Sequence, residues 1–467
     1  MTRFLVTDAL SSENLRSRPK AHTMEGTYAT HNSAGVTLSH WQKRIMFGCF
    51  VCTFMMYAGR RDLNAVLAPF LQDLNLKKTQ YGSMSSFFSA AFLFSKLFGG
   101  IAADLYVTPR NLLITALIMC GTASIFISAS SSPSFLVLLW LLNGLSQGIG
   151  WIPIAKILGK WYTKEQRATK WAIAMAAQNI AGAMVAIVGT WIASQHGWRV
   201  TMISFGSIIA ASSAVAVYHV TDTPKEAGFT HLEDKMSPAI HLDLEADRKT
   251  EHHHVGDVDL VNMIFKNKVV WLLFLSNLCM YTVRISILDW ILLFAMESRG
   301  LTTTGASSCV FWFELFSLAG GFASSYYSDK HCKGNRIPAC LYFSAGTALW
   351  CVALYSFVST SYFVNVFIIG MIGFFLNGPH TLLAVAATEL VDPRASGTSL
   401  GLIGGAVGAA GIAAGMPMGM IIRDQGWNVY VLCLVVTSTM MTVCCFILHT
   451  DSEKKEENRV QQDEHHK

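Results

Sequence analysis

Long apolar segments recur along the whole chain and limit what it can fold into. Each is about 20 residues or longer, the length that a helix needs to cross the hydrocarbon core of a bilayer. Hydrophobic residues make up 52% of the 467 and charged residues only 14%, a balance that is unusual for a water-soluble chain. About twelve such segments are present by this length criterion, at 42–72, 83–105, 111–130, 134–158, 170–194, 200–220, 266–296, 306–328, 338–358, 361–390, 396–422 and 427–449. The sequence therefore predicts an all-α membrane protein with twelve transmembrane helices.

Residues at matching spacings indicate that the chain is built from two repeats of six helices. Residues 222–265 form the only long polar segment inside the chain and predict a linker between the halves. Four features recur in the second half at a nearly constant offset in residue number, namely Asp104 and Asp329, Pro153 and Pro379, Arg167 and Arg394, and Gly197 and Gly426. The offset grows slowly along the chain, as small loop insertions would produce. Parallel repeats of this kind are typical of transporters with a substrate site at the bilayer midplane.

The domain organisation that follows has five parts. We predict a flexible N-terminal tail at 1–40, a six-helix bundle at 41–221, the linker at 222–265, a second six-helix bundle at 266–449 and a C-terminal tail at 450–467. Lys and Arg are more frequent in the loops after the second, fourth, eighth and tenth segments than in the opposite loops. By the positive-inside rule, both tails and the linker should be cytoplasmic.

Two arginines occupy related positions deep inside apolar segments. Arg61, in MYAGRRDLNAVLAP, and Arg284, in YTVRISILDW, lie one in each half and are separated by nearly the same offset. An arginine near the centre of a spanning helix costs about 2.5–3.5 kcal/mol on insertion scales and keeps its proton, so its charge needs compensation. Guanidinium groups match phosphate oxygens with paired donors. We expect Arg61 and Arg284 to line a central aqueous cavity and to grip a phosphate from two sides.

The alternative is that acidic side chains, or snorkelling to the surface, satisfy these two arginines. Glu314 and Glu389 lie in other apolar segments and could pair with either arginine or with a lysine in the membrane. Asp62 and Asp289 are poor partners for the arginines nearest to them in sequence, since residues one or five apart on a helix point in different directions. The sequence leaves the pairing open.

Other polar residues in the apolar segments are candidates for the same cavity, although packing explains each of them equally well. Arg60 competes with Arg61, because adjacent helical residues point about 100° apart and only one should face the cavity. The remaining candidate substrate contacts are Tyr57, Lys96, Gln147, Trp151, Lys156, Gln178, Asp289 and His380. The glycines of 400–415 indicate close helix packing.

A clamp with one arginine from each half suggests an exchange mechanism. When the site is empty, closing the halves should press two positive charges into a low-dielectric space. A bound phosphate should instead stabilise the closed state. This reasoning predicts a protein that reorients only when loaded, which is an obligate exchanger.

Several other functions find no support in the sequence. The net charge is +5 without a clustered basic face, so nucleic-acid binding is not expected. Cys49 and Cys52 have C-x-x-C spacing but no second ligand pair, and the histidines at 252–254 lie in the polar linker, so we expect no metal. No nucleophile or cofactor-binding loop is evident, and we expect neither a cofactor nor an enzyme. The oligomeric state stays open.

The chain resembles the organophosphate:phosphate antiporters of the major facilitator superfamily over residues 45–448. Arg61 stands eight residues before Pro69, as the family's first substrate arginine stands before its proline, and YTVRISILDW resembles the motif with the second. TDTPKEAGF at 221–229 and NGPHTLLAVAATELVDPRASGTS at 377–399 are similar to further family segments. LNGLSQGIGWIPIAKILGKWY at 142–162 most resembles the glucose-6-phosphate translocases within the family.

This resemblance implies the major facilitator fold, antiport of a phosphate ester against inorganic phosphate, and substrate contacts at Arg61 and Arg284. It also implies gating or helix-bridging roles for membrane charges, namely Asp104, Arg110, Asp329, Arg336, Glu314 and Glu389. The match at 142–162 favours a hexose phosphate, most of all glucose-6-phosphate, and residence in the endoplasmic reticulum or the plasma membrane.

The chain departs from the family at two positions that bear on the substrate. Asp62 replaces a residue that is usually lysine, and Gln178 stands where glycerol-3-phosphate transporters have histidine. The glucose-6-phosphate translocases also tend to have lysine at the position of Arg284. The alternatives that stay open are a glycerol-3-phosphate antiporter, a proton-coupled organic-anion transporter and a non-transporting sensor of sugar phosphates.

Overall fold

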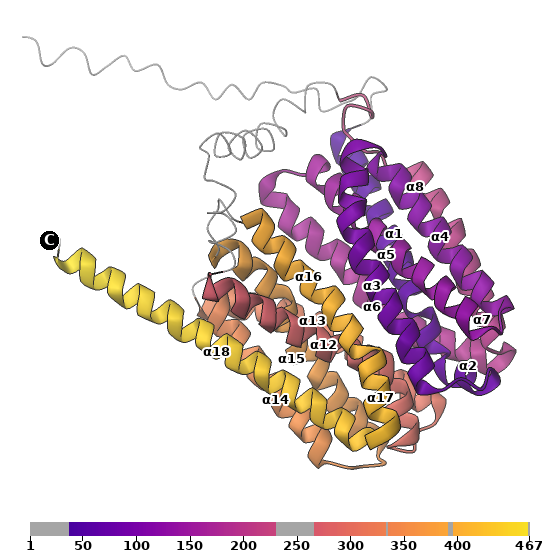
Figure 1. Ribbon diagram of the computed structural model, residues 1–467. Helices are drawn as coiled ribbons and strands as arrows, with labels where there is room; N and C mark the ends of the chain where they lie inside the picture. Colours follow the sequence, from indigo (N-terminus) through magenta and orange to yellow (C-terminus); the bar gives the residue numbers. More distant parts are fainter. Residues whose placement is uncertain (1–36, 230–265, 333–334, 391–395, 466–467) are drawn as a thin grey trace, which may run out of the picture.

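Two groups of long helices make up the protein in a computed structural model, which describes residues 37–229, 266–332, 335–390 and 396–465 (Figure 1). The first group holds α1 (Leu38–Ala65), α2 (Leu67–Asp73), α3 (Lys78–Leu105), α4 (Pro109–Ala129), α5 (Pro133–Trp161), α6 (Lys164–His196), α7 (Trp198–Ala211) and α8 (Ser213–His219). The second holds α12 (Lys268–Glu297), α13 (Thr303–His331), α14 (Arg336–Ser356), α15 (Tyr362–Leu390), α16 (Ser396–Ala414), α17 (Met416–Gln425) and α18 (Trp427–His465).

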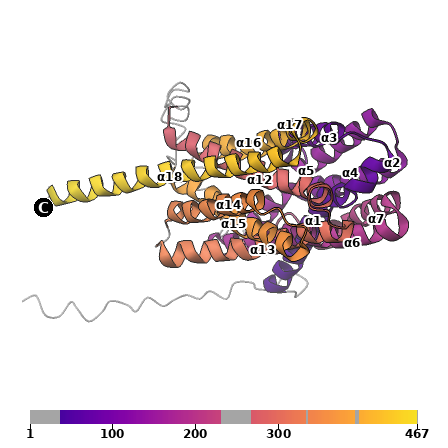
Figure 2. The same cartoon turned by 90° about the horizontal axis from the view of Figure 1, so that it is seen from below.

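Ten helical segments in the described ranges have the length and hydropathy of a membrane span, and the all-α, multi-pass prediction is confirmed. The other two predicted spans correspond to α1 and α3, which are 28 residues long each but are not among the ten. The count of twelve spans is therefore confirmed in part. Most of the predicted N-terminal tail and linker lie outside the described residues. α18 continues beyond the predicted last span to His465, and Figure 2 shows it projecting from the second group.

The internal repeat is visible in the geometry of the Gly-Trp steps. Gly197 and Gly426 both have φ +84°, with ψ 164° and −177°, and each ends one helix directly before a tryptophan that begins the next. That tryptophan then donates to the carboxylate at the end of an earlier helix of its half, namely α2 in the first half and α12 in the second. Trp198 Nε1 donates to Asp73 Oδ2 at 3.0 Å, and Trp427 Nε1 donates to Glu297 Oε2 at 2.9 Å. The offset between these two carboxylates is close to that between the two arginines.

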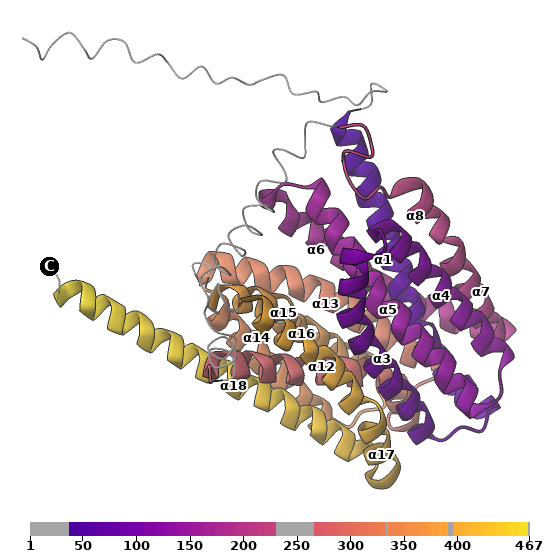
Figure 3. The ribbon, with the colours of Figure 1, turned by 45° about the horizontal axis from the view of Figure 1, so that its top comes forward.

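The halves touch along α3 and α16–α17, which lie side by side in Figure 3. A Cβ added at Gly82 would lie 2.8 Å from Gly415 O, so the backbones are in direct contact there. Lys78 Nζ, at the same end of α3, lies 2.5 Å from Glu297 Oε2 of the other half. Towards the beginning of α16 the two groups of helices diverge in Figure 1, and a Cβ added at Gly404 would meet nothing within 4 Å. The halves are therefore closed at the end that holds Lys78 and farther apart at the predicted cytoplasmic end.

A break in the second half forms part of this contact. α16 ends at Ala414 and α17 begins at Met416, with Gly415 at φ −82° and ψ −103° between them. Ser86 of α3 satisfies two backbone groups at the break, since its Oγ donates to Ile412 O at 2.9 Å and accepts from Met416 N at 2.7 Å. A side chain of one half thus completes the hydrogen bonding of a helix in the other.

Candidate functional site

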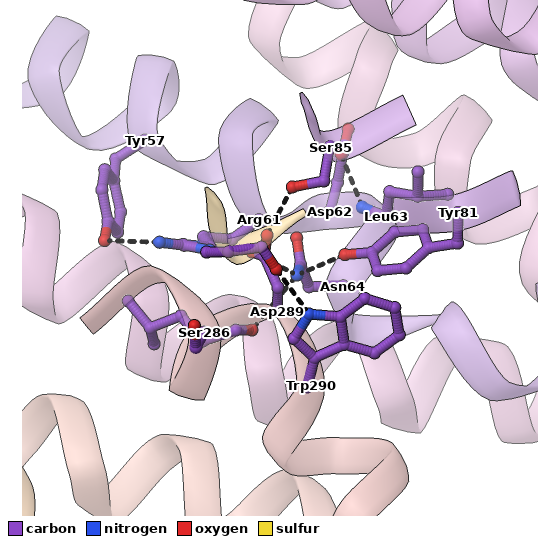
Figure 4. Close-up of polar contacts among 12 residues, drawn as sticks. Tyr57, Arg61, Asp62, Leu63, Asn64, Tyr81, Ser85, Ser286, Asp289 and Trp290 are labelled. Carbon is purple, nitrogen blue, oxygen red and sulfur yellow. Dashed lines mark hydrogen bonds and ion pairs between the residues drawn. The ribbon is translucent and has the colours of Figure 1, made fainter. Parts of the chain in front are cut away.

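Arg61 is held at the interface between the halves by a carboxylate from the opposite half (Figure 4). Its side chain is 7% exposed, and Nη1 lies 3.2 Å from Asp289 Oδ1 on α12. Asp289 also accepts hydrogen bonds from Asn64 Nδ2 at 3.2 Å and from Ser85 Oγ at 2.6 Å. Residues of α1 and α3 therefore surround a single carboxylate of the second half. This arrangement, which we call the Asp289 lock, ties the halves together.

Arg284 has a different set of partners, which come from three other helices. Its Nη2 lies 3.1 Å from Glu314 Oε2 on α13 and 3.2 Å from Asn179 Oδ1 on α6. Its Nη1 lies 3.5 Å from Asn377 Oδ1 on α15. Glu314 is completely buried. One carboxylate and two amide oxygens thus compensate the charge of this arginine.

Tyr57 joins the two arginine sites into one network. Its hydroxyl accepts from Arg61 Nη2 at 3.4 Å and donates to Glu314 Oε1 at 3.3 Å. Gly182 of α6 lets the backbone of the first half approach the same carboxylate, since an added Cβ would lie 2.7 Å from Glu314 Oε1. Arg61 and Arg284 are therefore parts of one buried network that crosses the boundary between the halves.

The compensation by carboxylates corrects one prediction from the sequence. We expected the empty site to resist closure because of two unbalanced positive charges, but here each arginine pairs with one carboxylate. Of the acidic residues considered, Glu314 pairs with Arg284 and Asp289 pairs with Arg61. The Glu389 side chain lies outside the described residues. Removing one member of a buried ion pair typically costs about 3–5 kcal/mol, so attraction between these pairs holds the closed arrangement together.

The network leaves little free space around it. A cavity of about 10 Å³ is lined by Arg61, Asn64 and Glu314, together with small and apolar residues. This is about the volume that one water molecule needs. The cavity therefore has no room for a ligand much larger than one water molecule.

Arg60 and Lys96 lie beside the network over aromatic rings. The guanidinium carbon of Arg60 is 5.0 Å from the centre of the Phe92 ring and 5.4 Å from that of Phe88, and Lys96 Nζ is 5.8 Å from the Phe92 ring. Neither cation forms an ion pair with another described residue. Of the two adjacent arginines, Arg61 is thus the one that belongs to the network, while Arg60 faces α3.

The remaining predicted substrate contacts are residues of α5, α6 and α15. Tyr281 and His380 stack edge to face with their ring centres 5.5 Å apart. Gln178 Nε2 contacts the sulfur of Met175 at 2.9 Å. Gln147 is fully buried and donates to Met56 O at 2.7 Å, which places it between α1 and α5. The half-buried Trp151 and Lys156 are on α5. Their role in substrate binding stays a prediction.

The remaining charges serve other contacts. Asp329 and Arg336 form an ion pair between α13 and α14. The backbone N–H of Arg110 donates to Asp222 Oδ1 at 2.7 Å, whereas the Asp104 side chain lies outside the described residues. Asp62, as expected, does not pair with Arg61. Its Oδ2 accepts from Ser124 Oγ at 2.5 Å inside the first half.

Four members of the network were missed by the sequence reasoning, namely Asn64, Ser85, Asn179 and Asn377. All are uncharged, and polar uncharged residues are frequent in membrane helices, so each gives a weak signal alone. Asn64 could have been found from its position three residues after Arg61, which places both on one helical face. Asn377 stands three residues before His380, a candidate already named.

Comparisons with known proteins agree with this architecture. A sequence profile of the Major Facilitator Superfamily matches residues 49–416. The chain is 30% identical to the probable hexose phosphate transport protein of Chlamydia muridarum, over 85% of this chain and 88% of that protein. It is 28% identical to the glycerol-3-phosphate transporter of Bacillus subtilis, over 89% and 95% of the two chains. It is 27% identical to the membrane sensor protein UhpC of Escherichia coli, over 83% and 88%.

The fold is also similar to that of solved structures. A bacterial homologue of the human lysosomal transporter Spinster, in an inward-facing and unoccupied conformation, matches with a TM-score of 0.63 at 15% sequence identity. The match covers 88% of this chain and 95% of the other. Fold and site together define a multi-pass helical membrane protein with a charged centre between two repeats. The chain belongs to the major facilitator superfamily, in the group of the organophosphate:phosphate antiporters.

Proposed function

We propose that this protein exchanges a sugar phosphate, most of all a hexose phosphate such as glucose-6-phosphate, for inorganic phosphate by alternating access. The observation that carries the proposal is the network in which Arg61 and Arg284, one from each half, are each paired with one carboxylate. Two carboxylates carry the same charge as one phosphate dianion. A phosphate at this place can therefore replace both while keeping the guanidinium groups compensated.

The Asp289 lock explains why such a protein would need its substrate in order to reorient. Opening the closed end requires that Asp289 on α12 leaves Arg61 on α1, and an unpaired charge in the membrane is costly. A phosphate that binds Arg61 supplies the missing negative charge. Each displaced carboxylate keeps an uncharged hydrogen-bond donor. Asp289 retains the donors of Asn64 and Ser85. Glu314 retains the hydroxyl of Tyr57. Exchange then depends on phosphate, because phosphate releases Arg61 from Asp289.

The identity of the organic group rests on similarity. The Chlamydia relative is named as a probable hexose phosphate transport protein, and a further relative, 26% identical, is the hexose-6-phosphate:phosphate antiporter of Salmonella typhimurium. The same network would also bind glycerol-3-phosphate, since its two arginines contact only the phosphate group. Both termini are proposed to be cytoplasmic, which makes this structure closed towards the opposite side of the membrane.

A second candidate is a sensor that binds the same ligand without transport. It is favoured by the similarity to UhpC, a membrane sensor protein of Escherichia coli. A sensor would bind a sugar phosphate at the network but would not move it across the membrane. Measurement of flux therefore distinguishes the two candidates.

The proposal is tested by reconstitution into vesicles loaded with inorganic phosphate. External glucose-6-phosphate should release labelled phosphate from vesicles that contain the wild-type protein. Arg61→Ala and Arg284→Ala should each lower the exchange rate at least about 100-fold, since each removes a charge-assisted contact to the dianion. Arg423→Ala is a matched control, because Arg423 is half exposed and pairs with the adjacent Asp424. Normal exchange by both clamp variants would refute the assignment.

A further inference from the structure

The two amides around Arg284 have a feature that its charge compensation does not require. Asn179 of α6 and Asn377 of α15 are 8% and 4% exposed, and each turns its oxygen towards the guanidinium group. The amino group of each amide donates to no other described residue. Each half therefore places one N–H₂ group, without an acceptor among the described residues, next to the same arginine.

Asn377 lies on the side of the network that faces the predicted cytoplasm, and Asn179 contacts the same guanidinium group. α15 runs from Tyr362 towards Leu390, and Asn377 is followed one turn later by His380. The ring of His380 contacts that of Tyr281, which stands one turn before Arg284 on α12. A ligand that enters from the end where the halves are apart would thus meet rings first, amides next and the arginines last. The organic part of a phosphate ester would lie at the level of the amides.

An amide and a guanidinium group suit different ligand groups. A guanidinium group only donates, and it suits the oxygens of an anion. An amide offers a donor and an acceptor without charge, which suits a hydroxyl group that does both. The carbon atoms next to an ester phosphate bring their hydroxyl groups close to whatever binds that phosphate. Groups that contact Arg284 itself are therefore within reach of those hydroxyls.

We propose that Asn179 and Asn377 form a hydroxyl-binding subsite that selects polyhydroxylated phosphate esters. This inference rests on the proposed function and adds the residues that select its organic substrate. One amide comes from each half, so the subsite is complete only when the halves approach each other around the organic group. Inorganic phosphate has no such group and gains nothing from the subsite. The preference for a sugar phosphate over phosphate then depends on these two amides.

The test compares half-saturation constants in phosphate-loaded vesicles for the wild type, Asn179→Leu and Asn377→Leu. The ratio of KM for glucose-6-phosphate to KM for inorganic phosphate should rise about tenfold in each variant, since each leaves a substrate hydroxyl without its partner. The wild type should also discriminate against a deoxy sugar phosphate that lacks the contacted hydroxyl, and the variants should lose that discrimination. Asn277→Leu is the control, because Asn277 is on α12 but donates to Leu273 O. It should keep the wild-type ratio.

The outcomes separate this inference from the proposed function. A wild-type protein that fails to exchange phosphate for phosphate would refute the proposed function itself. A wild type that exchanges, with unchanged ratios in both variants, would overturn only the subsite. Equal increases of KM for phosphate and for the sugar phosphate would show that the amides bind the phosphate group, which also overturns it. If a leucine variant does not fold, Asn179→Ala and Asn377→Ala give the same comparison, since alanine also lacks a hydrogen-bonding side chain.

Discussion

Asp289 of the second half accepts hydrogen bonds from Arg61, Asn64 and Ser85 of the first half, so one carboxylate joins the two halves. The sequence identifies Arg61, Arg284 and Asp289 as intramembrane polar residues, because charges in apolar segments are rare and usually functional. It also excludes a pair between Arg284 and Asp289 from their spacing on one helix. It cannot show that Asp289 reaches Arg61, since that contact depends on how α12 is rotated against α1. The pair was therefore beyond prediction, although both partners were named.

The Asp289 lock predicts an unusual effect of phosphate on stability. Asp289→Asn leaves Arg61 without its carboxylate, which should lower the thermal unfolding temperature of the purified protein. Phosphate can then supply the missing negative charge, so its addition should raise the unfolding temperature by more in the variant than in the wild type. Thermal unfolding with and without phosphate measures both effects. Asp424→Asn, at a side chain that is 54% exposed, is the control.

An equal response to phosphate in Asp289→Asn and the wild type would contradict the lock. It would mean that Asp289 and phosphate do not compete for the same arginine.

Among the elements, the positions of the long helices were predictable and their breaks were not. Hydropathy locates the spans because it measures the apolar length that a bilayer requires. Hydropathy does not depend on backbone dihedral angles. It therefore cannot predict the helix breaks at Val66, Ser212 and Gly415. The break at Gly415 depends on Ser86 of a distant helix for its hydrogen bonds. Such tertiary support cannot be read from local sequence.

Ser86 is expected to stabilise the closed end of the protein. Ser86→Ala removes the partner of Ile412 O and Met416 N, so the contact of α3 with the break between α16 and α17 should weaken. A cysteine that replaces the buried Ser89 of α3, labelled with a membrane-impermeant reagent from the Lys78 side, reports that opening. We expect labelling to be several-fold faster with Ser86→Ala than without it.

The control for this experiment is Ser83→Ala, since Ser83 donates within its own helix to Thr79 O. It should leave the labelling rate unchanged. Equal rates with Ser83→Ala and Ser86→Ala would refute the role of Ser86.

The repeated glycines should not tolerate a side chain. Gly197 and Gly426 have φ +84° with ψ near 180°, a region that is essentially restricted to glycine and costs other residues about 1–3 kcal/mol. Gly197→Ala and Gly426→Ala should each lower thermal stability by this amount, in both halves alike. Gly404→Ala should have little effect, because Gly404 is helical and has no neighbour within 4 Å. Thermal unfolding of the three variants decides this, and a neutral Gly426→Ala would be inconsistent with the structure.

At the scale of the whole molecule, the two repeats were predictable from residue spacing alone. The nearly constant offset in residue number corresponds to equivalent positions in the structure, from the arginines of α1 and α12 to the glycines before Trp198 and Trp427. The conformational state was not predictable. Under the proposed alternating access, one sequence supports states that open to either side and differ by a few kcal/mol, so no single pattern specifies which is adopted. The lock seen here belongs to the state that is closed at Lys78 and Glu297.

The requirement for phosphate during reorientation is the central claim, and counterflow measures it most directly. Uptake of labelled phosphate should be compared between vesicles loaded with unlabelled phosphate and vesicles that contain only a non-substrate salt at the same ionic strength. The Asp289 lock predicts that initial uptake is at least about tenfold faster into the loaded vesicles, because the empty protein must break a buried ion pair to return. Equal initial rates in the two preparations would show that the empty protein reorients freely and would contradict the account.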